Sequence, residues 1–230
     1  MRFQAPESLS EQIAQHLGRR IVMGELKPGE RIQELKIAGE LDVSRGSVRE
    51  ALLILERRHL IQIFPRKGAV VSGLTAELVV SLYDIYINLL IMLARTVVVR
   101  WSGTQLVPLI QQVQRLRKLA DSEDRPIEDI IDSGLEVMRL CYPIVGNPYL
   151  EETLENFRPA ISRTYFLAMQ RYRGEMEQTK TFFRRLMDTA QSRDADGIEA
   201  AIRDFGEHQK QVVLEMLNAE SGATAPSLAS

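Results

Sequence analysis

The sequence is poor in the residues that build disulfides and transition-metal sites. Its 230 residues include one cysteine, Cys141, and three histidines, His16, His59 and His208. A single cysteine cannot form an internal disulfide, and one histidine outside the first 60 residues cannot hold a metal alone. The chain also lacks a glycine-rich phosphate loop and any plausible catalytic triad. These absences predict a protein that is not an enzyme and that holds no metal or other cofactor.

Long uninterrupted hydrophobic runs are also missing. The most apolar stretch, Leu78 to Val99, is interrupted by Ser81, Asp84, Asn88, Arg95 and Thr96. A membrane-spanning helix needs about 20 consecutive, mostly apolar residues, so this stretch is expected to be a buried helix. The first twelve residues contain no apolar core of a signal peptide. We therefore expect a cytoplasmic protein with no membrane partner.

Charge is nearly balanced over the whole chain, with a net charge of −2, but it is distributed unevenly. Residues 1–75 hold 12 Lys and Arg against 9 Asp and Glu, whereas the remainder holds 17 against 22. The basic excess at the N-terminal end is small. It becomes informative only through the positions of its members, because attraction to phosphates depends on local clustering of cations.

The N-terminal residues predict three short helices. Ser8 and Glu11 form a capping box at the start of a helix over about 9–23. A second helix is expected over about 34–40, with Leu35 and Ala38 facing inward. Ser44 is expected to cap the third, whose apolar face contains Val48, Ala51, Leu52 and Leu55.

Two short β-branched runs, 60–63 and 69–71, follow these helices and are separated by a basic tip. Three helices and a hairpin predict a winged helix-turn-helix over residues 1–74. Beyond it, the patterns predict an all-α helical bundle over 75–218, so that the fold class is mainly α. Its six helices are expected near 76–101, 104–121, 126–142, 148–171, 175–193 and 196–218. The small, polar segment 219–230 is expected to be a disordered tail.

The start of the third helix carries the residues expected to read DNA. A recognition helix enters the major groove by its N-terminal end, so base contacts come from its first two turns. Arg45 and Arg49 lie one turn apart and can each bond a guanine edge. The hydroxyls of Ser44 and Ser47 suit phosphate oxygens, and Gly46 permits close approach. The alternative is that both arginines are solvated residues paired with neighbouring acids, Glu50 or Asp42.

The hairpin tip supplies a second basic feature. Arg66 and Lys67 are expected to contact phosphates or the minor groove, and Gly68 is expected to form the turn. The alternative is an ordinary solvated hairpin. Together with the third helix, this tip predicts binding to double-stranded DNA.

Several of these motifs resemble those of the GntR family of transcriptional regulators. The resemblance lies in Leu26–Ile32 (LKPGERI), Leu41–Arg45 (LDVSR) and Val48–Leu52 (VREAL), together with Gly68 in the wing. It implies a winged helix-turn-helix that binds a pseudo-palindromic operator as a homodimer, with an additional backbone or base contact from Lys36 on the second helix. The sequence departs from the usual pattern at Gly46-Ser47, where a Thr-Pro pair is common, and at His59, where glycine is common.

The C-terminal part resembles the FadR subfamily with its FCD-type domain. In many such domains, an Asp and a His on the helix before the Gly146-Asn147 turn belong to a metal site that binds a carboxylate ligand. The corresponding positions here are Gly134 and Met138, which cannot ligate a metal. A metal-dependent carboxylate sensor is therefore the alternative only if this alignment is wrong.

Replacement of these polar positions suggests an apolar effector site. Its expected lining residues are Tyr86, Leu90, Met138 and Phe183, and the lining suits an apolar or acyl-type molecule. Arg139 and Arg163 are the candidates to meet an anionic group on the ligand.

The alternatives are a filled core, or an apolar face of the first C-terminal helix used for dimerisation. The function expected is a DNA-binding regulator, most simply a repressor, controlled by a small-molecule effector. An effector-independent dimeric regulator stays open.

Overall fold

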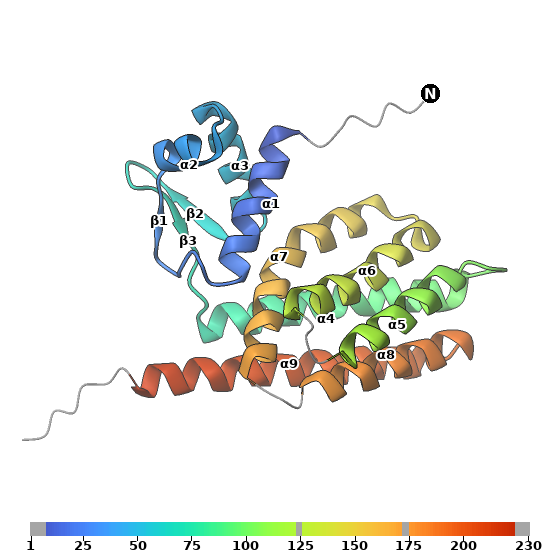
Figure 1. Ribbon diagram of the computed structural model, residues 1–230. Helices are drawn as coiled ribbons and strands as arrows, with labels where there is room; N and C mark the ends of the chain where they lie inside the picture. Colours follow the sequence, from blue (N-terminus) through green and yellow to red (C-terminus); the bar gives the residue numbers. More distant parts are fainter. Residues whose placement is uncertain (1–7, 123–125, 172–174, 224–230) are drawn as a thin grey trace, which may run out of the picture. The chain divides into compact units, whose positions relative to one another are not determined.

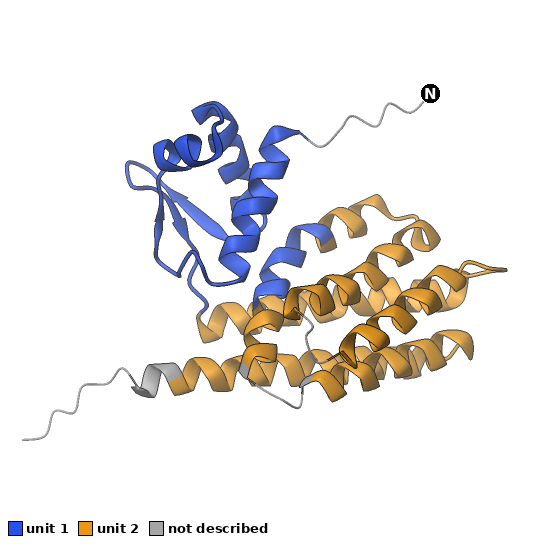
Figure 2. Cartoon of the chain, viewed as in Figure 1, with its two compact units in different colours: residues 1–74, 155–163 blue, residues 75–154, 164–230 orange. Residues whose placement is uncertain are grey.

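The computed structural model describes residues 8–122, 126–171 and 175–223 (Figure 1). The chain divides into two compact units (Figure 2). Unit 1 contains residues 1–74 and 155–163, and unit 2 contains residues 75–154 and 164–230. The first break lies where the composition changes, but residues 155–163 group with unit 1, although sequence reasoning assigned them to the C-terminal domain.

Unit 1 contains the three expected helices, α1 (Leu9–Val22), α2 (Glu34–Leu41) and α3 (Arg45–Arg57). Helix α1 begins where the Ser8 hydroxyl accepts a hydrogen bond from the backbone N–H of Glu11. The Glu11 carboxylate does not complete a capping box. It instead accepts a hydrogen bond from Arg58, which ties α1 to the end of α3.

One residue of α2 faces the opposite way from the prediction. Leu35 is 67% exposed, whereas Ile37 and Ala38 are buried in the core of unit 1. Because α2 begins at Glu34, Leu35 lies two residues, or about 200°, away from Ile37 around the helix. Leu35 and Lys36 therefore both face solvent.

A small antiparallel sheet completes unit 1. Its strands are β1 (Arg31–Ile32), β2 (Ile61–Phe64) and β3 (Gly68–Val71), in the order β1-β3-β2. Strands β2 and β3 form the expected hairpin, with Ile61 opposite Val71. Strand β1 was not predicted, because two residues are too few to show an alternating pattern.

The backbone conformation of His59 accounts for the glycine that is common at this position in the family that the sequence resembles. His59 has φ 59°, in the left-handed region that residues with a side chain rarely adopt. Its ring stacks on Phe157, with centroids 5.2 Å apart and planes 14° apart, and both residues belong to unit 1. This stacking offsets part of the cost of the backbone conformation.

The secondary structure of the described residues of unit 2 consists of helices joined by short loops. The elements are α4 (Ala76–Arg100), α5 (Val107–Ala120), α6 (Ile127–Val145), α7 (Pro148–Arg171), α8 (Glu175–Gln191) and α9 (Ala195–Ala223). The centre of α7, residues 155–163, belongs to unit 1, and its two ends belong to unit 2. Within unit 2, the long helices α4 and α9 lie against each other (Figure 1).

Helix ends in unit 2 follow local signals with two exceptions. Asn147 accepts hydrogen bonds from the N–H groups of Tyr149 and Leu150 at the start of α7, as an N-cap should. Helix α6 continues through Pro143 to Val145, instead of ending at residue 142, and is capped by Gly146, which has φ 63°. Helix α9 runs to Ala223, past the predicted end at 218, and the rest of the predicted tail, 224–230, lies outside the described residues.

Helix α4 has two apolar faces. One is buried in unit 2 through residues that include Val79, Tyr83 and Tyr86. The other is exposed. By length and composition alone, α4 is the one helix among the described residues that could cross a membrane, but a core helix of a soluble protein passes the same test.

Candidate functional site

The N-terminal end of α3 presents a cluster of polar groups to solvent. Ser44 caps the helix, because its hydroxyl oxygen accepts a hydrogen bond from the N–H of Ser47 at 3.0 Å. The two serine hydroxyls are also hydrogen-bonded, at 2.9 Å. Arg45, Gly46 and Arg49 are exposed around this end. An exposed helix start of this kind offers N–H groups and guanidinium groups to an anionic partner.

Both arginines contact one carboxylate on α2. Arg49 places Nη2 3.2 Å from Glu34 Oε2 and Nε 3.4 Å from Oε1, and Arg45 Nη2 lies 3.4 Å from Oε2. The hydrogen bond from Arg49 is the main cause that lowers the pKa of Glu34. The two arginine side chains are 57% and 65% exposed, so these ion pairs are weak and exchangeable.

Glu50 and Asp42, the two acidic residues proposed as alternative partners of the arginines, have other structural roles. Glu50 accepts a hydrogen bond from the Ser10 hydroxyl. Asp42 occupies the left-handed position that ends α2, with φ 52°. Sequence reasoning did not identify Glu34 as the partner, because it lies 11 and 15 residues from Arg45 and Arg49. These separations are too long for a helical spacing rule to connect the residues.

The tip of the β2–β3 hairpin is basic and exposed. Arg66 has φ 66° and Gly68 has φ 80°, and the N–H of Lys67 bonds to the carbonyl of Phe64, which closes the turn. The guanidinium of Arg31, on β1, lies close to Gly68, 3.7 Å from where a Cβ atom would stand. Arg31 therefore adds a third cation beside the tip, a residue that sequence reasoning had used only as part of a motif.

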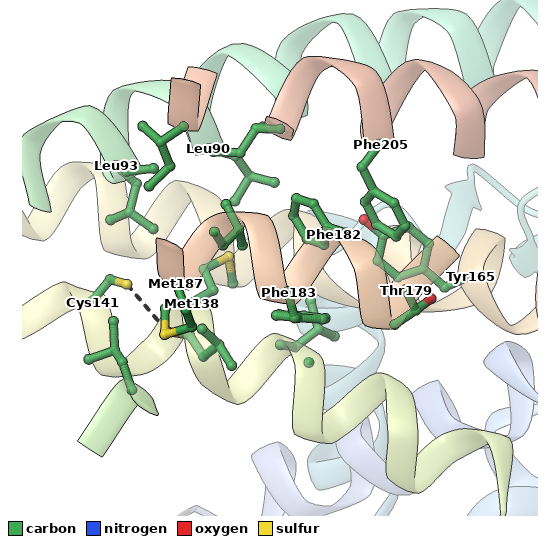
Figure 3. A pocket seen from close by; sticks show the side chains of 18 of the residues that line it. Leu90, Leu93, Met138, Cys141, Tyr165, Thr179, Phe182, Phe183, Met187 and Phe205 are labelled. Atoms are coloured by element: carbon green, nitrogen blue, oxygen red, sulfur yellow. Dashed lines mark hydrogen bonds between the residues drawn. The ribbon is translucent and has the colours of Figure 1, made fainter. Parts of the chain in front are cut away.

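Unit 2 contains an apolar cavity of about 120 Å³ (Figure 3). Residues from all six of its helices line the cavity, among them four predicted from the sequence, Tyr86, Leu90, Met138 and Phe183. The lining contains neither Arg139 nor Arg163. Arg139 is exposed beside Glu136, and Arg163 is buried in unit 1, where it donates to the carbonyl of Ser72 at 2.8 Å.

The two positions that would carry metal ligands lie in the cavity wall and are filled by apolar groups. Phe183 packs over Gly134, so that a Cβ atom at position 134 would stand 3.2 Å from the ring. The hydroxyl of Tyr86 donates to Met138 Sδ at 3.6 Å. The described residues contain no group of three or more His, Cys, Asp or Glu side chains that could hold a metal ion. This wall suits an apolar ligand.

One end of the cavity is polar. Figure 3 shows Tyr165, Thr179 and Phe205 at this end, and Cys141 and Leu93 at the opposite end. Thr179 is only 4% exposed, and its Oγ1 has no hydrogen-bond partner. Sequence reasoning missed Thr179, because a threonine on the buried face of an amphipathic helix gives no signal of a cavity beside it.

The sequence matches two known families along most of its length. Residues 9–71 match the family described as "Bacterial regulatory proteins, gntR family", and residues 81–208 match the FCD domain. The chain is 27% identical over 188 residues to the Gluconate operon transcriptional repressor of Bacillus subtilis (strain 168), covering 79% of this chain and 72% of that protein. It is 24% identical over 213 residues to the HTH-type transcriptional repressor RspR of Escherichia coli (strain K12), covering 90% and 91%.

Solved structures agree with the fold. The structure of E. coli McbR/YncC superposes with a TM-score of 0.77 at 20% identity, covering 92% of this chain and 99% of that one. A putative GntR transcriptional regulator from Rhodococcus sp. RHA1 superposes with a TM-score of 0.70 at 18% identity, covering 91% and 99%. At these identities the likeness establishes the fold alone.

Proposed function

Since the chain belongs to the gntR family of bacterial regulatory proteins and carries an FCD domain, we propose a DNA-binding repressor whose operator affinity is controlled by a small apolar effector. Members of this family are transcriptional regulators and not enzymes. The observation that carries the effector role is the apolar cavity inside unit 2. Well-packed domains contain few voids larger than a water molecule, so a cavity of about 120 Å³ is a candidate ligand site.

The DNA interface is the N-terminal end of α3 together with the hairpin tip. Arg45 and Arg49 can exchange Glu34 for guanine edges, because both arginines are exposed and their ion pairs are weak. Ser44 and Ser47 would contact phosphates, with Gly46 allowing approach. Lys36, Arg66, Lys67 and Gly68 complete the proposed contact surface.

The names of two relatives support the proposed sign of regulation, which is repression. Both the Bacillus subtilis and the Escherichia coli relatives are named as repressors. A protein that occupies a promoter without the effector and leaves it with the effector would act in this way. The cytoplasm is the expected location, since that is where the DNA lies.

A symmetric dimer is proposed to form through the exposed face of α4. Leu78, Ile85, Met92 and Val99 are spaced seven residues apart and are 51%, 53%, 47% and 72% exposed. A seven-residue apolar repeat on one helix is the pattern by which two identical helices pack together. Dimerisation would present two α3 helices to the two halves of a pseudo-palindromic operator.

Helix α7 is the proposed route between effector and DNA. Phe157 and Arg163 belong to unit 1, where they contact His59 and Ser72, and Tyr165, two residues further on, lines the cavity of unit 2. A ligand that displaces Tyr165 would therefore act on a continuous helix whose centre packs within unit 1.

The test is operator affinity with and without small apolar compounds. An operator would be selected in vitro from random duplex DNA, and its Kd measured by fluorescence anisotropy. A compound that changes the Kd at least about tenfold is expected, which corresponds to a typical coupling free energy.

The matched control is Ala94→Phe, which places a ring into the cavity from α4 and should leave operator binding intact while abolishing the response. If no compound in a small apolar library changes the Kd, the regulator is independent of an effector. Transcription that rises when the protein is added to a reconstituted operator–promoter system would refute repression.

A further inference from the structure

We infer that the cavity of unit 2 selects a compact, uncharged aromatic molecule that carries a single hydroxyl or carbonyl group, with that group held at the Thr179 end. This inference rests on the cavity being the ligand site proposed above. It adds the chemical class of the ligand, which follows from the size of the cavity, its charge and the position of its polar atoms.

The size of the cavity limits the ligand to about one ring. An engineered apolar cavity of about 150 Å³ binds benzene, and the cavity here measures about 120 Å³. Of the apolar or acyl-type molecules that the sequence suggested, a long acyl chain exceeds this space. Three flexible methionines in the wall, Met138, Met169 and Met187, allow modest expansion.

The chemistry of the wall favours an aromatic ligand. Phe182, Phe183 and Phe205 line the cavity together with the three methionines. The rings of Phe182 and Phe205 are stacked, with centroids 4.1 Å apart. Aromatic rings and thioether sulfurs both make favourable contacts with a further ring, beyond what their apolar area alone provides.

The lining excludes ligands that carry either a negative or a positive charge. The lining that the structure describes contains no Lys, Arg, His, Asp or Glu. A carboxylate or ammonium group inside would be buried without a partner, which is far more costly than burying a neutral polar group. Burial raises the pKa values of two groups in the wall, Tyr165 and Cys141, so both stay protonated at neutral pH.

The position of the polar group comes from Thr179. Among the described residues, its Oγ1 is the one buried side-chain nitrogen or oxygen without a hydrogen-bond partner. Buried polar groups are nearly always paired, so this hydroxyl points to a partner that binds there. Tyr165 lies at the same end and offers a second hydroxyl (Figure 3). One neutral oxygen on the ligand can bond both.

Three ligands that share one ring test the inference: p-cresol, p-xylene and p-toluate. They place a hydroxyl, a methyl and a carboxylate at the same ring position. Binding to the full-length wild-type protein would be measured by isothermal titration calorimetry at neutral pH. We expect p-cresol to bind about tenfold more tightly than p-xylene, because only p-cresol pairs the Thr179 hydroxyl, and p-toluate not to bind.

Thr179→Val removes the hydroxyl and keeps the shape of the side chain. It should remove the preference for p-cresol, leave the p-xylene affinity unchanged, and leave thermal stability equal or higher, because no unpaired hydroxyl stays buried. Thr189→Val, on the same helix, is the control. Its hydroxyl bonds to the carbonyl of Arg185 and does not line the cavity, so the preference should persist.

Each outcome bears on one of the two proposals. Equal binding of p-cresol and p-xylene, or a preference that survives Thr179→Val, would overturn the polar anchor. Tightest binding of p-toluate would overturn the neutral class, and failure of all three to bind would overturn the cavity as a site for one ring. A p-cresol complex with the expected preference but unchanged operator Kd would refute the effector role and leave the ligand class standing.

Discussion

Replacing Glu34 by glutamine is expected to tighten operator binding. In the free protein, the Glu34 carboxylate contacts both Arg45 and Arg49, at distances of 3.2 to 3.4 Å. If these arginines read bases, the operator must compete with Glu34 for their guanidinium groups. Removing the carboxylate charge removes that competition.

The size of the effect follows from the exposure of the two ion pairs. Each arginine side chain is more than half exposed, and such pairs contribute about 0.2–1 kcal/mol each. Together they oppose DNA binding by about 0.4–2 kcal/mol, so Glu34→Gln should lower the operator Kd by about two- to thirtyfold. The same pairs contribute at most this much to folding.

The assay is fluorescence anisotropy on the selected operator, and the control is Glu40→Gln. Glu40 lies on the same helix and pairs with Arg20, at 2.9 Å, away from the arginines of α3. Both variants lose one negative charge, so the difference between them isolates the competition. A Kd that rises in Glu34→Gln would refute the reasoning, because it would mean that Glu34 holds the arginines in the conformation that DNA requires.

The contribution of Glu34 to folding stability is expected to decrease as the pH falls. The pKa of Glu34 is lowered from its ordinary value of 4.5, so its contribution to folding is fully present above 4.5 and is lost as pH falls through the lowered pKa. The stability difference between wild type and Glu34→Gln, measured by urea unfolding, should therefore be constant near neutral pH and disappear in acid.

Three further variants test the rest of the proposed function, and one alkylation reaction tests the burial of Cys141. Arg49→Ala should cost about 1–3 kcal/mol on the preferred operator and relax selection at one base position, whereas equal weakening on every sequence would refute base reading. Lys67→Ala should weaken all sequences and reduce the slope of log K against log salt by about one, and an unchanged slope would exclude a phosphate contact. Ile85→Glu should convert the proposed dimer to monomer in sedimentation measurements, since it places a charge in the α4 repeat, and a persistent dimer would assign the interface elsewhere. Cys141, whose pKa burial raises to about 12, should not react with iodoacetamide at pH 8 until the protein unfolds.

Local signals predicted the parts of the molecule that local physics controls. Three helices start at the N-cap residues that the sequence predicted, Ser8, Ser44 and Asn147. Each of these side chains accepts a hydrogen bond from a backbone N–H three residues further along the chain. Predictions failed where a local signal competed with packing. Pro143 should end α6, but it lies at the exposed surface of a helix whose other face is buried, and the helix continues to Val145.

The candidate sites divide in the same way. The exposed arginines of α3 could be chosen from the sequence because their proposed role depends on one helix and its first turns. The partner that holds them, Glu34, could not, because only the packing of α2 against α3 brings it within 3.4 Å. Likewise, Arg163 looked like a ligand contact in sequence, but the fold buries it against the Ser72 carbonyl.

The sequence by itself determined a winged helix-turn-helix followed by a helical bundle, and the basic positions of the first. These properties depend on residue type, periodicity and neighbours a few positions apart. Only the tertiary structure decided that Leu35 faces solvent, that the centre of α7 belongs to unit 1, and that Thr179 ends unpaired in a cavity lined by six helices. Those outcomes depend on contacts between residues tens of positions apart, which no local pattern encodes.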